Sequence, residues 1–357
     1  MDREQTTTEF LLGQCARCPA LRPEDLLKAL YQSVFGCGHL VTDEAAGVRR
    51  IREELTTAPA DTGPDIEPLD GGFCRVHLRY LTKSGLTPET LFRLFALSAE
   101  GPCGGAAELE EKLAVLLALA RDGRLPFSRD ELAPAVERWR DGGFPACRHS
   151  APFRDACAPA YRLVRRDLVW TLPLLADIDR RLAEKPRVLV AIEGGSASGK
   201  TTLAALLERL YGCNVFHMDD FFLRPGQRTA ARLAEPGGNV DRERFFEEVL
   251  RPLTQGRTVR YRRYDCHAQT LGVPVETAPG ALNVVEGAYS MHPDLAGHYD
   301  LSVFLRVPPE LQKTRILARN GPEVGRRFFT RWIPLEERYF AALDPAGRCD
   351  MILEVEP

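Results

Sequence analysis

The chain has 357 residues, of which 44% are hydrophobic and 27% are charged, and its formal net charge is -3. This length exceeds the size at which one hydrophobic core usually stops growing, so we expect two domains. With 47 basic against 50 acidic side chains, the chain lacks the basic surplus of a nucleic-acid-binding surface.

The amino-terminal sequence MDREQTTTEF is charged and polar and lacks the apolar segment of a signal peptide. The longest apolar run, Leu113 to Ala120, is too short to cross a hydrocarbon layer about 30 Å thick. We therefore predict a cytoplasmic protein without a membrane span.

Residues 1–185 are expected to form a mainly helical domain. Apolar residues recur three and four positions apart, which is typical of amphipathic helices. This spacing predicts helices over residues 23–36, 43–55, 87–99, 107–123 and 128–143, and a last helix from about Tyr161 to Ala183. The stretch from Gly72 to Leu81 interrupts the pattern and is interpreted as a short strand or an extended loop.

The function of this first domain is left open by its residues. Cys15, Cys18, Cys37 and His39 are acceptable zinc ligands by type, but their spacing fits no finger pattern, and buried thiols are the alternative. In a reducing compartment we expect most of the ten cysteines to be buried thiols. Three roles remain: a second enzymatic step, a ligand-sensing module, or a helical platform that joins copies into a homo-oligomer.

After Pro186 the pattern changes to short apolar strands that alternate with helices, which predicts a mostly parallel sheet. The expected strands cover residues 187–192, 214–218, 281–286, 301–307 and 350–355. The expected helices cover residues 200–210, 242–253, 309–319 and 326–343. Residues 186–357 should therefore form a separate α/β domain.

A complete GxxxxGK[ST] motif follows the first of these strands and opens the first helix. Its residues are Gly194, Gly195, Ser196, Ala197, Ser198, Gly199, Lys200 and Thr201, with Thr202 next in the helix. Glycines let the backbone N–H groups and the helix N-terminus face phosphates, while Lys200 neutralises them and Thr201 offers a hydroxyl to Mg2+. The motif predicts a P-loop domain that binds ATP and Mg2+; the alternative is a glycine-rich turn that happens to carry a lysine.

Two adjacent carboxylates, Asp219 and Asp220, follow the next predicted strand. Open α/β sheets place their ligands at the carboxyl ends of the strands, so one of these groups is positioned to accept a proton from an acceptor hydroxyl. The alternative is that the pair caps a following turn or helix.

These residues resemble the uridine kinase and phosphoribulokinase group of P-loop kinases. The loop sequence GGSASGKTT is typical of this group. Three further segments follow in the same order as in the family: MDDFF at 218–222, NVDRERFF at 239–246 and YRRYDCHAQT at 261–270. In uridine kinases the corresponding segments read approximately DSFY, NFDHPDAF and PxYDFxxHSR. The likeness covers about residues 187–345.

The resemblance implies roles for individual residues. Asp219, rather than Asp220, matches the aspartate that activates the hydroxyl and lies near the metal. Asp241 matches the acidic residue that holds sugar hydroxyls, and its sequence equally fits a helix N-cap. Tyr264, Asp265 and His267 match the segment that contacts the base, although His267 follows Asp265 by two positions and not four.

The family also places an acidic residue near magnesium, which Glu286 matches; the alternative is a solvated charge at a strand end. It also has a mobile lid that carries arginines. Guanidinium groups bind phosphate oxygens bidentately and stay charged, which suits a lid. The lid region of this sequence holds Arg315, Arg319, Arg326, Arg327 and Arg331. Arg319 is the first candidate for a catalytic role, with Arg331 next as a nucleotide contact, followed by Arg327.

The predicted function is therefore an ATP-dependent kinase that phosphorylates a hydroxyl group on a small molecule. A nucleoside is the leading acceptor, with pantothenate, glycerate or a sugar phosphate as related ones. The alternative is a nucleotide-gated regulator in which ATP binding reorganises the helical half. The acceptor-side residues Asp219, Asp241 and His267 favour the enzyme, because a switch has no need of them.

Overall fold

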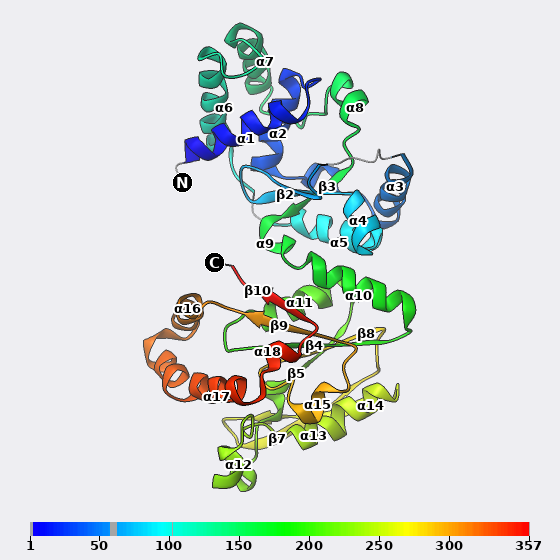
Figure 1. Cartoon of the computed structure of the whole chain (residues 1–357), viewed down its shortest axis with the longest axis vertical. Coiled ribbons are helices and arrows are strands. Elements are labelled where there is room, and N and C mark those ends of the chain that lie inside the picture. Colours follow the sequence, from blue (N-terminus) through cyan, green and yellow to red (C-terminus); the bar gives the residue numbers. More distant parts are fainter. Residues whose placement is uncertain (1–2, 58–62, 102, 357) are drawn as a thin grey trace. The chain divides into compact units, whose positions relative to one another are not determined.

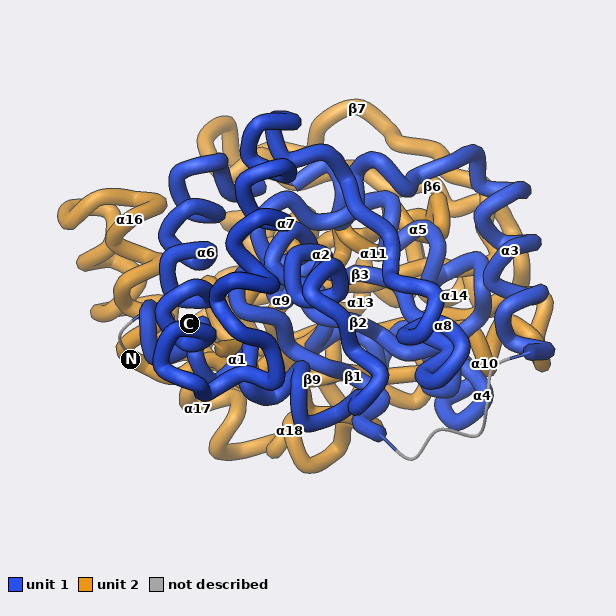
Figure 2. The backbone as a smooth tube through the Cα atoms, turned by 90° about the horizontal axis from the view of Figure 1, so that it is seen from above, with its two compact units in different colours: residues 1–177 blue, residues 178–357 orange. Residues whose placement is uncertain are grey.

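The computed structural model describes residues 3–57, 63–101 and 103–356. The chain divides into two compact units, residues 1–177 and residues 178–357, which Figure 2 colours separately. Among the described residues, no helix is long and apolar enough to cross a membrane.

The first unit combines helices with a small sheet that contains β2 and β3 (Figure 1). This sheet is antiparallel and has the strand order β1-β2-β3. The strands are β1 (Ile66–Pro68), β2 (Phe73–His77) and β3 (Tyr161–Arg165). The helices are α1 (Arg3–Arg17), α2 (Pro23–Phe35), α3 (Glu44–Thr57), α4 (Arg79–Ser84), α5 (Pro88–Ala99), α6 (Ala106–Arg121), α7 (Arg129–Asp141), α8 (Ala151–Cys157) and α9 (Arg166–Val169), with a 3-10 turn at Gly38–Leu40. Helix α10 (Leu172–Glu184) runs across the division between the units.

Local sequence explains where several of these helices begin. Thr87 caps α5 by accepting a hydrogen bond from the backbone N–H of Thr90. Ser128 and Glu131 form a reciprocal capping box at the start of α7. The helical spacing of leucines then brings α1, α2, α6 and α7 onto a shared apolar cluster that includes Leu11, Leu30, Leu116 and Val136.

The sequence prediction for this unit needs one correction and missed its first helix. Residues 161–165 are not helical, because they pair as strand β3 with β2, Tyr161 lying opposite His77. Helix α1 was not expected, and it buries Leu11 completely. The interruption at Gly72 to Leu81 contains strand β2 and the start of α4.

The proposed zinc ligands do not come together. Cys18 forms a disulfide with Cys157, Cys37 is buried and His39 is exposed. Within the described ranges, no group of three or more His, Cys, Asp or Glu side chains could hold a metal ion. Of the eight free cysteines, three are buried, three half-buried and two exposed, so burial is less general than expected.

The second unit is an α/β domain with a five-stranded parallel sheet in the order β10-β9-β4-β8-β5 (Figure 1). The strands are β4 (Val188–Gly194), β5 (Asn214–His217), β8 (Leu282–Glu286), β9 (Leu301–Arg306) and β10 (Met351–Glu354). All five lie where the alternation of strands and helices predicts them. Strand β4 is buried along its whole length, as expected for a central strand of a parallel sheet.

Helices and a hairpin connect these strands. The helices are α11 (Lys200–Tyr211), α12 (Ala230–Ala234), α13 (Arg242–Phe245), α14 (Arg251–Thr254), α15 (Pro293–Ala296), α16 (Pro309–Arg327), α17 (Ile333–Leu343) and α18 (Pro345–Arg348), with π-helical turns at Phe246–Leu250 and Phe328–Trp332 and 3-10 turns at Met218–Phe221 and Pro225–Gln227. The hairpin pairs β6 (Val259–Asp265) with β7 (Thr270–Thr277). In the sheet, β8 and β5 lie on one side of β4, and β9 and β10 lie on its other side, so the strand order reverses at β4. Such a reversal opens a crevice at the carboxyl ends of the strands, where ligands bind in α/β folds.

Candidate active site

The loop between β4 and α11 has the backbone conformation that its glycines allow. Gly194 has φ 147° and Gly199 has φ 102°, backbone angles that residues other than glycine rarely adopt. Ala197 also has a positive φ, 57°, in the middle of the loop. The first N–H groups of α11 have no carbonyl partner within the helix, so this end of the helix favours an anion.

Lys200 and Ser198 show how the loop fits a phosphate chain. The Nζ atom of Lys200 donates to the carbonyl oxygens of Gly194 and Gly195, both at 2.8 Å. The hydroxyl of Ser198 is buried and has no hydrogen-bond partner among the described residues. A lysine folded over its own loop, an unsatisfied hydroxyl and a helix N-terminus are together suited to the triphosphate of ATP.

Thr201 and Glu286 meet beside this loop. Strand register places Glu286 opposite Ile192 of β4 on one side and His217 of β5 on the other. The hydroxyl of Thr201 donates to Oε1 of Glu286 at 3.2 Å. A hydroxyl and one carboxylate suit Mg2+, which usually keeps several waters and takes its other ligands from substrate phosphates.

The sequence did not single out His217, which the structure adds to this group. Its Nδ1 lies 2.6 Å from Oε1 of Glu286, and this hydrogen bond raises the pKa of His217. The only signal in the sequence was its position near the end of the predicted strand, two residues before Asp219.

The two adjacent aspartates have different surroundings. The carboxylate of Asp220 is held by Arg263, whose Nε lies 3.3 Å from Oδ2, and by the hydroxyl of Tyr261. Asp219 is exposed and makes no hydrogen bond or ion pair with any residue that the structure describes. Surrounding protein atoms nevertheless desolvate it and raise its pKa, with Lys200 acting in the opposite direction.

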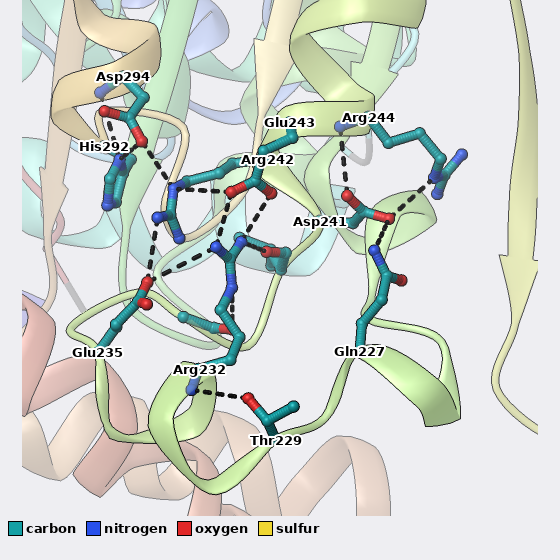
Figure 3. A network of polar contacts seen from close by, with 12 residues as sticks. Gln227, Thr229, Arg232, Glu235, Asp241, Arg242, Glu243, Arg244, His292 and Asp294 are labelled. Carbon is teal, nitrogen blue, oxygen red and sulfur yellow. Dashed lines mark hydrogen bonds and ion pairs between the residues drawn. The ribbon is translucent and has the colours of Figure 1, made fainter.

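Asp241 is buried and engaged within the protein. One carboxylate oxygen caps α13 by accepting the backbone N–H of Arg244, and the other accepts the side-chain amide of Gln227 at 2.8 Å. Figure 3 shows Asp241 between these two side chains. The helix-cap interpretation of Asp241 therefore has direct support, and the predicted contact with sugar hydroxyls stays a prediction.

Arg244 connects Asp241 to the aspartate turn. Its guanidinium lies over the ring of Phe221 at 4.1 Å and donates to the backbone oxygen of Asp220 at 2.9 Å. In an adjoining network of ion pairs, Arg232 binds Glu243 and so ties the segment before Asp241 to the residues after it (Figure 3). These contacts fix the backbone that carries Asp219.

The residues expected to contact a base lie in and beside the tip of the β6–β7 hairpin. Asp265 accepts the backbone N–H groups of His267 and Ala268, at 2.7 and 2.9 Å, and so stabilises the turn. Tyr264 is buried, and its hydroxyl accepts a hydrogen bond from Arg228 at 3.0 Å. His267 is exposed.

The arginines of α16 and the following turn differ in what they face. Arg319 lies over Phe328 at 5.9 Å and Arg331 lies over Trp332 at 4.9 Å, and both arginines are exposed. Arg315 instead reaches the phosphate-binding loop: its Nη1 is 4.0 Å from the point where a Cβ on Gly199 would lie. The structure thus shows Arg315 approaching the loop, a contact that the sequence alone could not indicate.

No family model matches the chain. Solved structures that resemble it include a possible uridine kinase from Bacillus stearothermophilus, 23% identical over 50% of this chain and 98% of that chain, with a TM-score of 0.38. A candidate fructose transport system kinase from a Silicibacter species is 23% identical over 47% of this chain and 89% of that chain, with a TM-score of 0.40. Shikimate kinase from Acinetobacter baumannii, solved with shikimate, is 18% identical over 49% of this chain and 87% of that chain, with a TM-score of 0.28. All three are described as kinases of small molecules, and each matches about half of this chain.

Proposed function

We propose that residues 178–357 form an ATP-dependent kinase that phosphorylates a hydroxyl group on a small molecule, with a nucleoside as the leading acceptor. The observation that carries this proposal is Asp219, a carboxylate without a partner among the described residues, in the turn that follows β5. Lys200 and Glu286 are close enough to act on its pKa. A nucleotide switch needs the loop and the magnesium ligands but no free carboxylate beside them.

The residues of the site divide the chemistry between them. Mg-ATP, when bound, supplies the γ-phosphoryl group. Asp219 accepts the proton of the acceptor hydroxyl, and its raised pKa makes it a stronger base than an ordinary aspartate. Lys200 and Arg315 stabilise negative charge on the transferring group, while Thr201 and Glu286 hold the metal ion.

Replacing each aspartate separately tests this role. Asp219→Asn should lower acceptor-dependent ADP release by about 100-fold or more, as expected for loss of a general base, with ATP binding retained. Asp220→Asn is the matched control, because that carboxylate is already held by Arg263 and Tyr261. It should keep most of the rate.

The measurement is the release of ADP from ATP in the presence of each acceptor of a panel. The panel contains nucleosides, pantothenate, glycerate and sugar phosphates, and mass spectrometry identifies the phosphorylated product. A nucleotide-gated regulator would release ADP at a rate that no acceptor changes, and Asp219→Asn would leave that rate intact. Either result would refute the kinase proposal.

A further inference from the structure

One residue of the phosphate-binding loop is held through each of its polar groups by side chains distant in sequence. The backbone N–H of Ser196 donates to Oε2 of Glu336 at 2.9 Å, and its hydroxyl donates to Oε1 of the same carboxylate at 2.6 Å. Its carbonyl oxygen accepts the side-chain amide of Gln312 at 2.8 Å. Glu336 is on α17 and Gln312 is on α16, and the carboxylate of Glu336 is buried.

A second contact from α17 reaches the residue that precedes the loop. Tyr339 is three residues after Glu336, on the same face of the helix. Its hydroxyl donates to Oε2 of Glu193 at 3.1 Å, and Glu193 also accepts the backbone N–H of Gly194 at 2.9 Å. Helix α17 is thus attached at both the start and the middle of the loop.

The close approach of these side chains limits the space at Gly195, the residue after the first glycine of the motif. A Cβ on Gly195 would lie 3.1 Å from the amide nitrogen of Gln312 and 3.4 Å from Oε2 of Glu336. The first distance is tighter than an ordinary contact, so a residue with a Cβ would displace the side-chain amide of Gln312 from its position beside the loop. Gly195 therefore serves this docking as well as the loop itself.

Residues 313–335 lie between Gln312 and Glu336, the two side chains that hold Ser196. We name this stretch the arginine segment because it carries Arg315, Arg319, Arg326, Arg327 and Arg331. It has two irregular places where bending is easy: Gly321, with a non-helical φ of 72°, followed by Pro322, and the π-helical turn at Phe328–Trp332. Its Trp332 also lies against Phe222, at 6.1 Å between ring centres, just beyond the aspartate turn.

We propose that Glu336 is a positioning residue that couples the phosphate-binding loop to the arginine segment. This inference rests on the proposed function, since it concerns the same nucleotide site. Ser196 adjoins Gly195, whose carbonyl oxygen Lys200 binds. When phosphates draw Lys200 away from that oxygen, the loop moves, and Glu336 and Gln312 transmit the movement to both ends of the arginine segment.

The test follows the arginine segment directly, without an acceptor or a turnover assay. The chain contains three tryptophans, so the protein labelled with 5-fluorotryptophan gives three fluorine resonances, and Trp332→Phe identifies the one from the segment. Binding of labelled ATP with Mg2+ is measured separately by equilibrium dialysis. In the native protein, saturating Mg-ATP should shift the Trp332 resonance.

Glu336→Ala should reduce that shift to less than half at saturating Mg-ATP, while ATP binding weakens by only about threefold to tenfold, as for the loss of one or two hydrogen bonds. Glu336→Gln should restore part of the shift, because its amide oxygen still accepts one hydrogen bond. Glu337→Ala, an exposed neighbour on the same helix, should behave like the native protein.

Ser196→Ala keeps the carboxylate and removes one donor, so it gives an intermediate result in a protein whose core is intact. A full Trp332 shift in both Glu336→Ala and Ser196→Ala would overturn the coupling, as would an unchanged Trp332 resonance in a native protein that binds Mg-ATP. If the native protein bound no Mg-ATP, the proposed function would fail as well, and dialysis alone distinguishes that case.

Discussion

The carboxylate of Glu193 is the most deeply buried acid of the second unit, with no exposed surface. Burial raises its pKa to about 7, although hydrogen bonds from the backbone N–H groups of Met291 and Gly194 act to lower it. The folded protein therefore binds a proton here at pH values where the unfolded chain, with a carboxyl pKa near 4.5, has lost it.

The sign of the pH dependence follows from this difference. Between about pH 4.5 and 7 the free energy of unfolding of the second unit should fall as the pH rises, by up to about 1.4 kcal/mol per pH unit from this group. Glu193→Gln should lack this contribution, whatever its overall stability. Urea unfolding at pH 5, 6, 7 and 8 gives both slopes, and identical slopes would mean that Glu193 titrates as an ordinary glutamate.

At the scale of single residues, the sequence indicated the loop, Asp219 and Glu286 because each is adjacent to a recognisable strand or motif. It did not indicate Glu336, because no local pattern connects α17 to Ser196, which is far away in the chain. Arg315 was one of five candidate arginines, and only its proximity to Gly199 separates it from Arg319. Long-range contacts of this kind become visible only when the chain is folded.

At the scale of elements, the residue after β8 lies close against the residue after β5. Gly287 follows β8 with φ 143°, and a Cβ there would lie 2.6 Å from Cβ of Met218, just after β5. Gly287→Ala should therefore cost about 1–3 kcal/mol of stability and displace Glu286 from Thr201. The free energy of unfolding and the affinity for Mg2+ with ATP measure the two effects.

Gly297→Ala is the matched control for this substitution. Gly297 follows the short helix α15 with an ordinary φ of -71°, and a Cβ there would meet nothing within 4 Å. Its cost should stay within about 0.5 kcal/mol, as for most surface substitutions. Equal losses in the two variants would contradict the argument from the Gly287 contact.

The elements that the sequence predicted correctly were those with strong hydrophobic patterns. The five strands of the parallel sheet are apolar runs bounded by turns, and they were all expected. The β6–β7 hairpin was missed because most of its strand residues are exposed, as at Arg262 and Val273, so no buried apolar run marks the strands. Residues 161–165 were assigned to a helix because pairing with β2 is a tertiary effect that local spacing does not reveal.

At the scale of the whole molecule, the chain forms two compact units. The phosphate-binding loop, the strand ends and the arginine segment all belong to residues 178–357. A single unfolding free energy does not describe a chain of this kind, because each unit has its own core. Calorimetry should therefore resolve one unfolding transition for each unit.

Mg-ATP should raise only the transition of the second unit. At a free concentration 100 times the dissociation constant, a ligand that binds only the folded state adds about 2.7 kcal/mol, which corresponds to about 5–10 °C for a unit of this size. The transition of the first unit should stay within about 1 °C, because the proposed site uses none of its residues. Lys200→Ala should abolish the increase without changing the transition of the first unit. An equal rise in both transitions would show that nucleotide binding also stabilises the first unit, and would favour a regulatory role for that unit.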